Sequence, residues 1–179
     1  MTIPTHIIWI NALALTSFAG VLDWRTRRIP NWLTVPALLA GIGINSVLLG
    51  WRGTTSSLEG AALALGILLP LVLLRALGAG DWKLMGAVGA ILGPARLLVL
   101  LLASIFAAGL MALVEVVRQG AAKQTALNLF VLVQGFFTFG LRPNPKISLD
   151  NPGLLKLPFG VATALATACC YVTFFWHLR

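Results

Sequence analysis

Two acidic residues, Asp23 and Asp81, are the ones whose type and placement could support catalysis. Asp23 ends the first long apolar run of the chain, and Asp81 lies just before the fourth. Two carboxyl groups within hydrogen-bonding reach hold one proton between them over a broad pH range. The ionised group can then take a proton from water while the protonated group donates to a carbonyl oxygen, as in aspartic proteases. The pair therefore predicts aspartic protease chemistry if the fold brings the two together.

Each aspartate also has a simpler interpretation. An aspartate at a helix end often caps the helix or pairs with a nearby base. Asp23 is followed by Arg25, Arg27 and Arg28, and Asp81 by Lys83. From the acids alone, a structural role therefore competes with catalysis.

The other three of the five acids have local explanations. A serine three residues before a glutamate is typical of a capping box at a helix start. A glutamate followed three residues later by a base is typical of an ion pair within a helix. The sequence Asp-Asn-Pro is typical of a turn. Asp150 stays a minor rival for catalysis because it is expected on the same side of the membrane as the pair. The three interpretations are Ser56 with Glu59, Glu115 with Arg118, and Asp150 in a turn.

Other site chemistries find little support in the sequence. Cys169 and Cys170 are adjacent and there is no CxxC pair, so a cysteine zinc site is excluded, and we expect no metal and no cofactor. His6 and His177 lie far along the chain from both aspartates, and no serine has an evident histidine base. The Gly-rich stretch 78–80 lacks the GK[ST] ending of a phosphate loop.

The composition indicates what must position the aspartates. The chain has 179 residues, of which 59% are hydrophobic and only 10% charged, and its mean hydropathy is +0.93. An ordinary soluble domain carries roughly 25% charged residues, so that class is excluded. The net charge is +8, but the bases are scattered between apolar runs, so we expect no nucleic-acid partner and read them as contacts with membrane lipids and as topology signals.

The apolar runs predict an all-α, polytopic membrane protein that forms a single domain over residues 1–179. About six transmembrane helices are expected, because a span needs about 20 apolar residues. The fourth run is too short for an ordinary span, so we expect a short or re-entrant helix, with Gly89 and Gly93 spaced for close helix packing. Segment 118–156 should be cytoplasmic or interfacial, with a possible short helix over 124–140. The expected spans are about 5–23, 32–51, 58–77, 82–93, 95–117 and 157–177.

Basic residues predict the orientation of these spans. Bases concentrate in cytoplasmic loops. The loops on one side of the membrane would carry ten basic residues, and the other side would carry only Arg52, Arg96 and Arg179. The side with ten should be cytoplasmic, so both termini should face outward and the aspartates should lie at the cytoplasmic face. The ten are Arg25, Arg27, Arg28, Arg75, Lys83, Arg118, Lys123, Arg142, Lys146 and Lys156.

Three short motifs, in this order and at these span positions, resemble the type IV prepilin peptidase family. The first follows Asp23, the second is the GxGD motif that ends in Asp81 and continues to a lysine, and the third opens the last span. The motif residues are Ile29, Pro30 and Asn31; Gly78, Gly80, Asp81 and Lys83; and Pro158, Phe159 and Gly160.

The resemblance implies an aspartic endopeptidase in a bacterial or archaeal cytoplasmic membrane. Such enzymes cleave the short basic leader of pilin-like precursors (prepilins, pseudopilins or Flp pilins) at the cytoplasmic face. By this resemblance Asp23 and Asp81 are the catalytic pair. Gly78 and Gly80 would let the backbone bend and pack closely. Lys83 and the arginines of 25–28 would contact anionic lipids or tune the acids.

The chain resembles the short form of the family, which serves tight-adherence (Flp) pilus systems. Longer members carry an insert with paired cysteines that is linked to N-methylation. Only seven residues separate Asp23 from Asn31, and none is a cysteine. This argues against methyltransferase activity.

The sequence is also compatible with two other functions. One is a non-enzymatic membrane subunit or a proton-coupled transporter, because paired intramembrane acids also relay protons. The other is a GxGD protease that cleaves transmembrane helices. The clustering of acids at one face disfavours a relay, and the Ile-Pro-Asn segment disfavours the second protease type.

Overall fold

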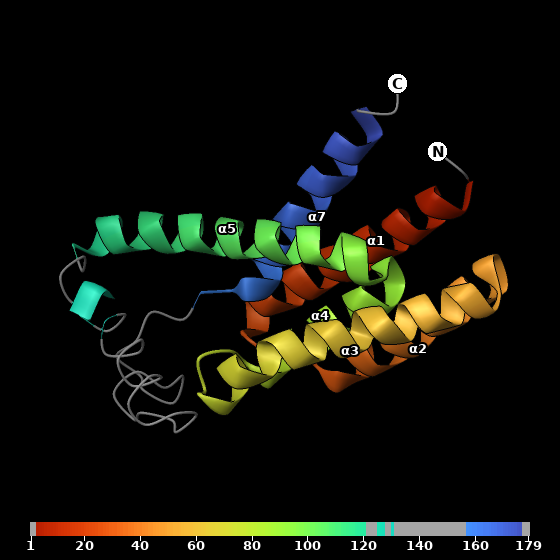
Figure 1. Ribbon diagram of the computed structural model, residues 1–179. Coiled ribbons are helices and arrows are strands. Elements are labelled where there is room, and N and C mark those ends of the chain that lie inside the picture. The colour runs from red at the N-terminus through yellow and green to blue at the C-terminus, as the bar shows by residue number, and fades with distance from the viewer. Residues whose placement is uncertain (1–2, 121–124, 128–129, 131–156, 177–179) are drawn as a thin grey trace.

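The structure, a computed structural model, describes residues 3–120, 125–127, 130 and 157–176 (Figure 1). The prediction of an all-α membrane protein is confirmed: the described residues form helices joined by short turns. The part of segment 124–140 for which a surface helix was considered lies mostly outside the described residues. The main helices are α1 (Ile3–Thr26), α2 (Asn31–Leu49), α3 (Trp51–Leu73), α4 (Ala79–Leu92), α5 (Pro94–Gln119) and α7 (Phe159–Trp176).

Five of these helices are long and apolar enough to cross a membrane, namely α1, α2, α3, α5 and α7. Helix α4 has 14 residues, which at the rise of an α-helix is about 21 Å and falls short of a hydrocarbon core of ~30 Å. The structure therefore confirms a multi-pass protein whose fourth helix is too short to be an ordinary span.

The expected boundaries of the third span were wrong. Helix α3 begins at Trp51, directly after Gly50, which has φ +62° and is the only residue between α2 and α3. A single left-handed glycine turns the chain here, so the polar residues after Trp51 continue the helix instead of forming a loop. Ser56 and Glu59 lie inside α3, and the capping box expected there does not form.

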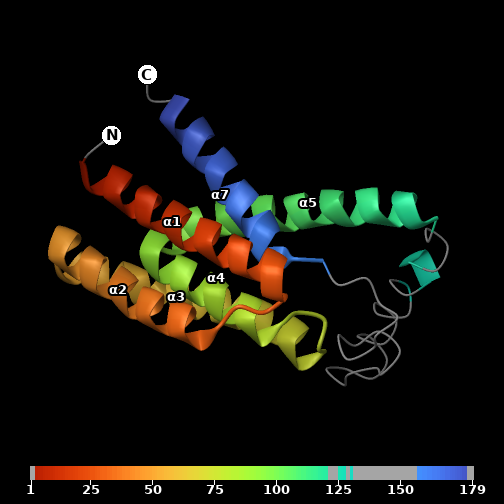
Figure 2. The ribbon, with the colours of Figure 1, turned by 180° about the vertical axis from the view of Figure 1, so that it is seen from behind.

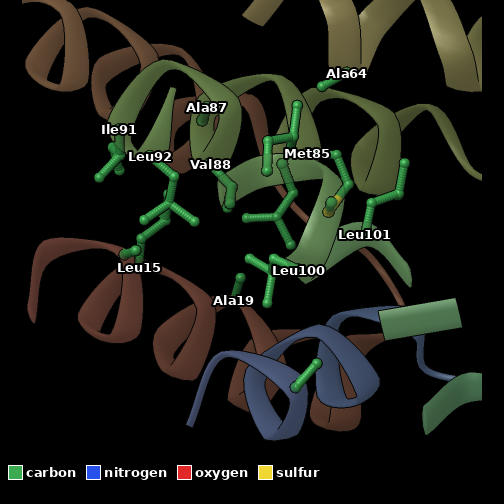
Figure 3. Close-up of a cluster of buried hydrophobic side chains, with 14 of the residues drawn as sticks. Leu15, Ala19, Ala64, Met85, Ala87, Val88, Ile91, Leu92, Leu100 and Leu101 are labelled. Atoms are coloured by element: carbon green, nitrogen blue, oxygen red, sulfur yellow. The ribbon is translucent and has the colours of Figure 1, made fainter. Parts of the chain in front are cut away.

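Helix α4 lies at the centre of the molecule. It packs against α1, α2, α3, α5 and α7, and residues 84–92 are all buried. Leu84 is fully buried, and Met85 and Val88 are likewise enclosed in the core (Figure 3). A helix surrounded by protein need not span the lipid, because its neighbours shield its ends.

Glycines allow α3 and α4 to approach backbone to backbone. A methyl group added to Gly60 would overlap the Gly89 carbonyl oxygen, and one added to Gly89 would overlap that of Gly60. The expected close packing at Gly89 is therefore found. Gly93 instead has φ +75° and ends α4, after which Pro94 begins α5.

The far end of α4 is tied down by a buried amide. Asn45 of α2 is 4% exposed, and its Nδ2 donates to the carbonyl oxygens of Ala90 (2.9 Å) and Ile91 (3.0 Å) and lies 2.8 Å from Ser57 Oγ. The last carbonyls of a helix have no partner within the helix. Asn45 supplies one and fixes the position of α4 along the bundle.

The first turns of α1 and the last turns of α7 lie side by side in both views (Figures 1 and 2). Aromatic contacts join them: His6 to Phe175, with ring centroids 5.7 Å apart, and Trp9 to Phe174, at 5.8 Å. The other end of α1, which carries Asp23, and the start of α4 lie at the opposite end of the bundle (Figure 1). The two aspartates thus share one end of the molecule.

Candidate active site

The two aspartates predicted to form a pair line one cavity. Asp23 lies near the end of α1 and Asp81 in the first turn of α4. The cavity has a volume of about 300 Å³, and the two carboxyl groups interact electrostatically. Its lining consists of Asp23, Arg27, Arg28, Ile29, Gly78, Ala79, Gly80 and Asp81.

The turn before α4 sets the direction in which the chain enters the site. At the end of α3, the Arg75 N–H donates to Val72 O (2.9 Å) and the Ala76 N–H to Leu71 O (2.9 Å), while Arg75 adopts φ +55°. This pair of hydrogen bonds around a left-handed residue is the Schellman motif. It ends α3 sharply, so that α4 begins a few residues later.

The GxGD spacing places Asp81 where a helix favours an acid. Gly78 is the N-cap of α4, so Asp81 is the third residue of the helix. A carboxylate there can accept from the N-cap N–H, as the acid of a capping box does, and the Gly78 N–H bonds Asp81 in this way. A methyl group on Gly78 would lie 2.9 Å from Asp81 Oδ2. Glycine at 78 therefore leaves room for the carboxylate.

Asp23 is held by the last motif of the sequence. The Gly160 N–H donates to Asp23 Oδ2 at 2.8 Å, and Asp23 is only 6% exposed. Gly160 lies in the first turn of α7, where N–H groups have no partner within the helix and favour an anion. A methyl group on Gly160 would lie 3.0 Å from Asp23 Cβ and 3.1 Å from its Oδ2.

The Ile-Pro-Asn segment lies between the elements that carry the two aspartates. Ile29 is buried, and a methyl group on Gly80 would lie 3.0 Å from its carbonyl oxygen and 3.1 Å from its Cβ. Pro30 is the N-cap of α2. Lys83 Nζ donates to Asn31 Oδ1 at 2.9 Å, so the segment is bonded to the first turns of α4.

Burial and the nearby charge of Asp23 favour the protonated form of Asp81. Desolvation by burial, and then the nearby charge of Asp23, raise the pKa of Asp81 to about 7, while the hydrogen bond from the Gly78 N–H opposes the rise. A carboxylic acid with such a pKa is mostly protonated below about pH 7. The arrangement can therefore present one carboxylate and one carboxylic acid to the same space.

The structure places residues of all three motifs near the two aspartates, and neither of the other two described acids lines the cavity. Glu115 pairs with Arg118 at 3.8 Å, as expected, and Glu59 is exposed on α3. Asp150 lies outside the described residues. Within the described part of the chain, no three His, Cys, Asp or Glu side chains gather as metal ligands.

Sequence reasoning missed two features of the site. One is the amide of Gly160, because a backbone donor has no signal in the sequence beyond the motif itself. The other is the particular place of Arg27: the sequence predicted that the arginines of 25–28 contact lipids or tune the acids, but it did not single out this one. Arg27 lines the cavity and acts electrostatically on Asp23.

Comparison with known proteins bears on this site. The family model described as the type IV leader peptidase family matches residues 10–113, which is more than half of the chain. The match includes Asp23, the Ile-Pro-Asn segment and the GxGD motif, and it ends before Gly160. No curated protein and no solved structure matches the chain.

Proposed function

The chain belongs to the type IV leader peptidase family, and from this membership we propose that it is an aspartic endopeptidase which cleaves the basic leader of pilin-like precursors. The family implies an aspartic peptidase and prepilin-like substrates. The observation that carries the proposal is the shared cavity of Asp23 and Asp81. The other two described acids, Glu59 and Glu115, do not line this cavity.

The proposed reaction is hydrolysis of one peptide bond by an activated water. The ionised aspartate takes a proton from water as the water oxygen attacks the scissile carbonyl carbon, and the protonated aspartate gives its proton to the carbonyl oxygen. When the resulting tetrahedral species collapses, the C–N bond breaks, the leaving nitrogen receives the proton held by the first aspartate, and a hydroxyl of the tetrahedral species returns its proton to the second. The pair returns to one proton in total, so no further reactant is needed.

The cavity suits an extended backbone. Its α4 wall consists of Gly78, Ala79 and Gly80, which leave backbone uncovered by large side chains. A substrate chain could approach Asp81 closely along this wall, because glycines allow close approach of one backbone to another. A folded or helical segment would be too wide for about 300 Å³.

Orientation supports cleavage at the cytoplasmic face. The expected loops on the side of the two aspartates carry ten of the thirteen bases, and bases mark the cytoplasmic side. A basic leader also stays on that side of the membrane, so substrate and cavity would meet there.

Asn substitutions test the proposal. With a pilin-like precursor co-expressed, Asp23→Asn and Asp81→Asn should each abolish the size shift on a gel, because either change leaves one proton-transfer role unfilled. Losses of this kind are commonly 10²-fold or more. Asp150→Asn is the matched control and should process normally, as should wild type in the presence of a chelator.

Complete processing by either Asn variant at the pair would contradict the two-aspartate mechanism. Loss of processing in Asp150→Asn alone would move the chemistry to the segment after α5.

A further inference from the structure

Arg27 adopts a backbone conformation that its residue type disfavours. Its φ is +53°, and its N–H donates to Asp23 O at 2.9 Å directly after α1. Glycine is the usual residue in this position, because it has no Cβ to clash in a left-handed turn. The turn by itself therefore does not explain why residue 27 is an arginine.

The cavity of the two aspartates explains why the residue at position 27 is an arginine. Arg75 is the other residue of the described chain that is not glycine and has a positive φ, and it does not line the cavity of the two aspartates. Arg27 differs because it lines the cavity of the two aspartates, and its charge acts on Asp23. Its backbone conformation and its position together point to a role for the guanidinium.

The two carboxyl groups have unequal surroundings. Asp23 is buried, which by itself disfavours its charged form, but it receives the N–H of Gly160 from α7 and the positive charge of Arg27, which both favour it. Asp81 faces it from α4 with one amide donor, from Gly78.

Other charges near the pair come from the elements packed around it. Arg28 lines the same cavity. Glu115 of α5 lines a neighbouring groove with Arg27 and pairs with Arg118. Lys83 of α4 bonds Asn31. Of these charges, that of Arg27 favours the ionised form of Asp23.

We propose that Arg27 is a positioning residue that holds Asp23 as the ionised member of the pair, which assigns water activation to Asp23 and protonation of the scissile carbonyl to Asp81. A positive charge beside a carboxylate favours the ionised form. The inference rests on the proposed function and adds a division of roles to it. The proton from water goes to Asp23 and the proton of Asp81 goes to the carbonyl oxygen, so the step balances without another reactant.

The test is the pH dependence of precursor cleavage by the purified protein in detergent. Arg27→Gln removes the charge, so Asp23 should ionise only at higher pH. The acid side of the pH profile should move up by about one pH unit, which is about a tenfold lower rate on that side. Arg27→Lys keeps the charge and should stay near the wild-type profile. A purely structural role would lower the rate at every pH equally.

Glycine variants separate this role from folding. Arg27→Gly and Arg75→Gly make the same change at the same backbone conformation, and both should raise the thermal midpoint because glycine accepts a positive φ. Arg27→Gly should nevertheless show the shifted pH profile, and Arg75→Gly should not. This pair keeps the test decisive if Arg27→Gln fails to fold.

An unchanged pH profile in Arg27→Gln or in Arg27→Gly would overturn the inference. The same preparations distinguish that result from failure of the proposed function. If wild type cleaves and Asp23→Asn does not, the endopeptidase proposal stands whatever the Arg27 variants show. If wild type leaves the precursor intact, the endopeptidase proposal itself fails.

Discussion

At the scale of single residues, both aspartates are held by the amide of a glycine at the start of a helix. The Gly78 N–H bonds Asp81 at the start of α4, and the Gly160 N–H bonds Asp23 at the start of α7. N–H groups in the first turn lack partners in the helix and suit an anion. The same type of hydrogen bond, from a glycine amide, thus orients both carboxyl groups. Glycine is favoured at each position because a side chain there would crowd the acid.

The pKa of Asp81 predicts the alkaline side of the pH profile. Since it is raised to about 7 and we assign the protonated role to Asp81, the cleavage rate should fall as the pH rises through about 7. The rate of precursor cleavage between pH 5 and 9 measures this directly. A rate that keeps rising to pH 9 would contradict the assignment.

The same shift predicts a change in stability. The pKa of Asp81 is raised from 3.8 to about 7 in the folded protein, so between these values the folded state binds more protons than the unfolded state. The free energy of unfolding should therefore fall as the pH rises through this window. Thermal midpoints in detergent at pH 5 and pH 8 test it, and Asp81→Asn should show a smaller difference between the two.

At the scale of helices, α4 positions the site through its packing. Its residues 84–92 are buried between the other helices, Asn45 binds its last carbonyls, and Gly60 and Gly89 bring it against α3. Any displacement of α4 therefore moves Asp81 relative to Asp23. Precise placement of the pair depends on contacts far from the cavity.

Substitution of Gly60 tests this dependence. Gly60→Ala would place a methyl group on the Gly89 carbonyl, and such overpacking costs about 1–3 kcal/mol. We expect a lower thermal midpoint and reduced cleavage. Gly66→Ala in the same helix is the matched control, because nothing lies within 4 Å of a methyl group there. Equal behaviour of the two variants would show that the α3–α4 contact does not position Asp81.

At the scale of the whole molecule, the two ends of the helix bundle differ in the residues that they carry. The end of α1 and the start of α4, which carry residues that line the cavity, lie at one end of the bundle (Figure 1). The start of α1 and the end of α7, which carry the paired aromatic residues, lie at the other end (Figure 2). Aromatic rings are typical of the membrane interface, and bases are typical of the cytoplasmic side. This polarity matches an enzyme whose substrate approaches from the cytoplasm.

The orientation itself can be measured with reporters. A protein that fluoresces only in the cytoplasm should stay dark when fused after Arg179, and should fluoresce when inserted after Gly120. A periplasmic phosphatase at the same two positions should give the reverse result. Fluorescence after Arg179 would show that the bases have been assigned to the wrong side.

The sequence by itself determined the helical membrane class, the short fourth helix and the two aspartates with their motifs. These follow from local properties: apolar run length, the Gly-Pro break after Leu92 and the GxGD spacing that puts Asp81 in a first turn. The start of α3 was wrong because one left-handed glycine turned the chain where charge and polarity suggested a loop. The cavity, the amide of Gly160 on Asp23 and the place of Arg27 came only from the tertiary structure. They depend on residues as far apart as 23 and 160, and the run of apolar residues along a helix does not specify which neighbour it packs against.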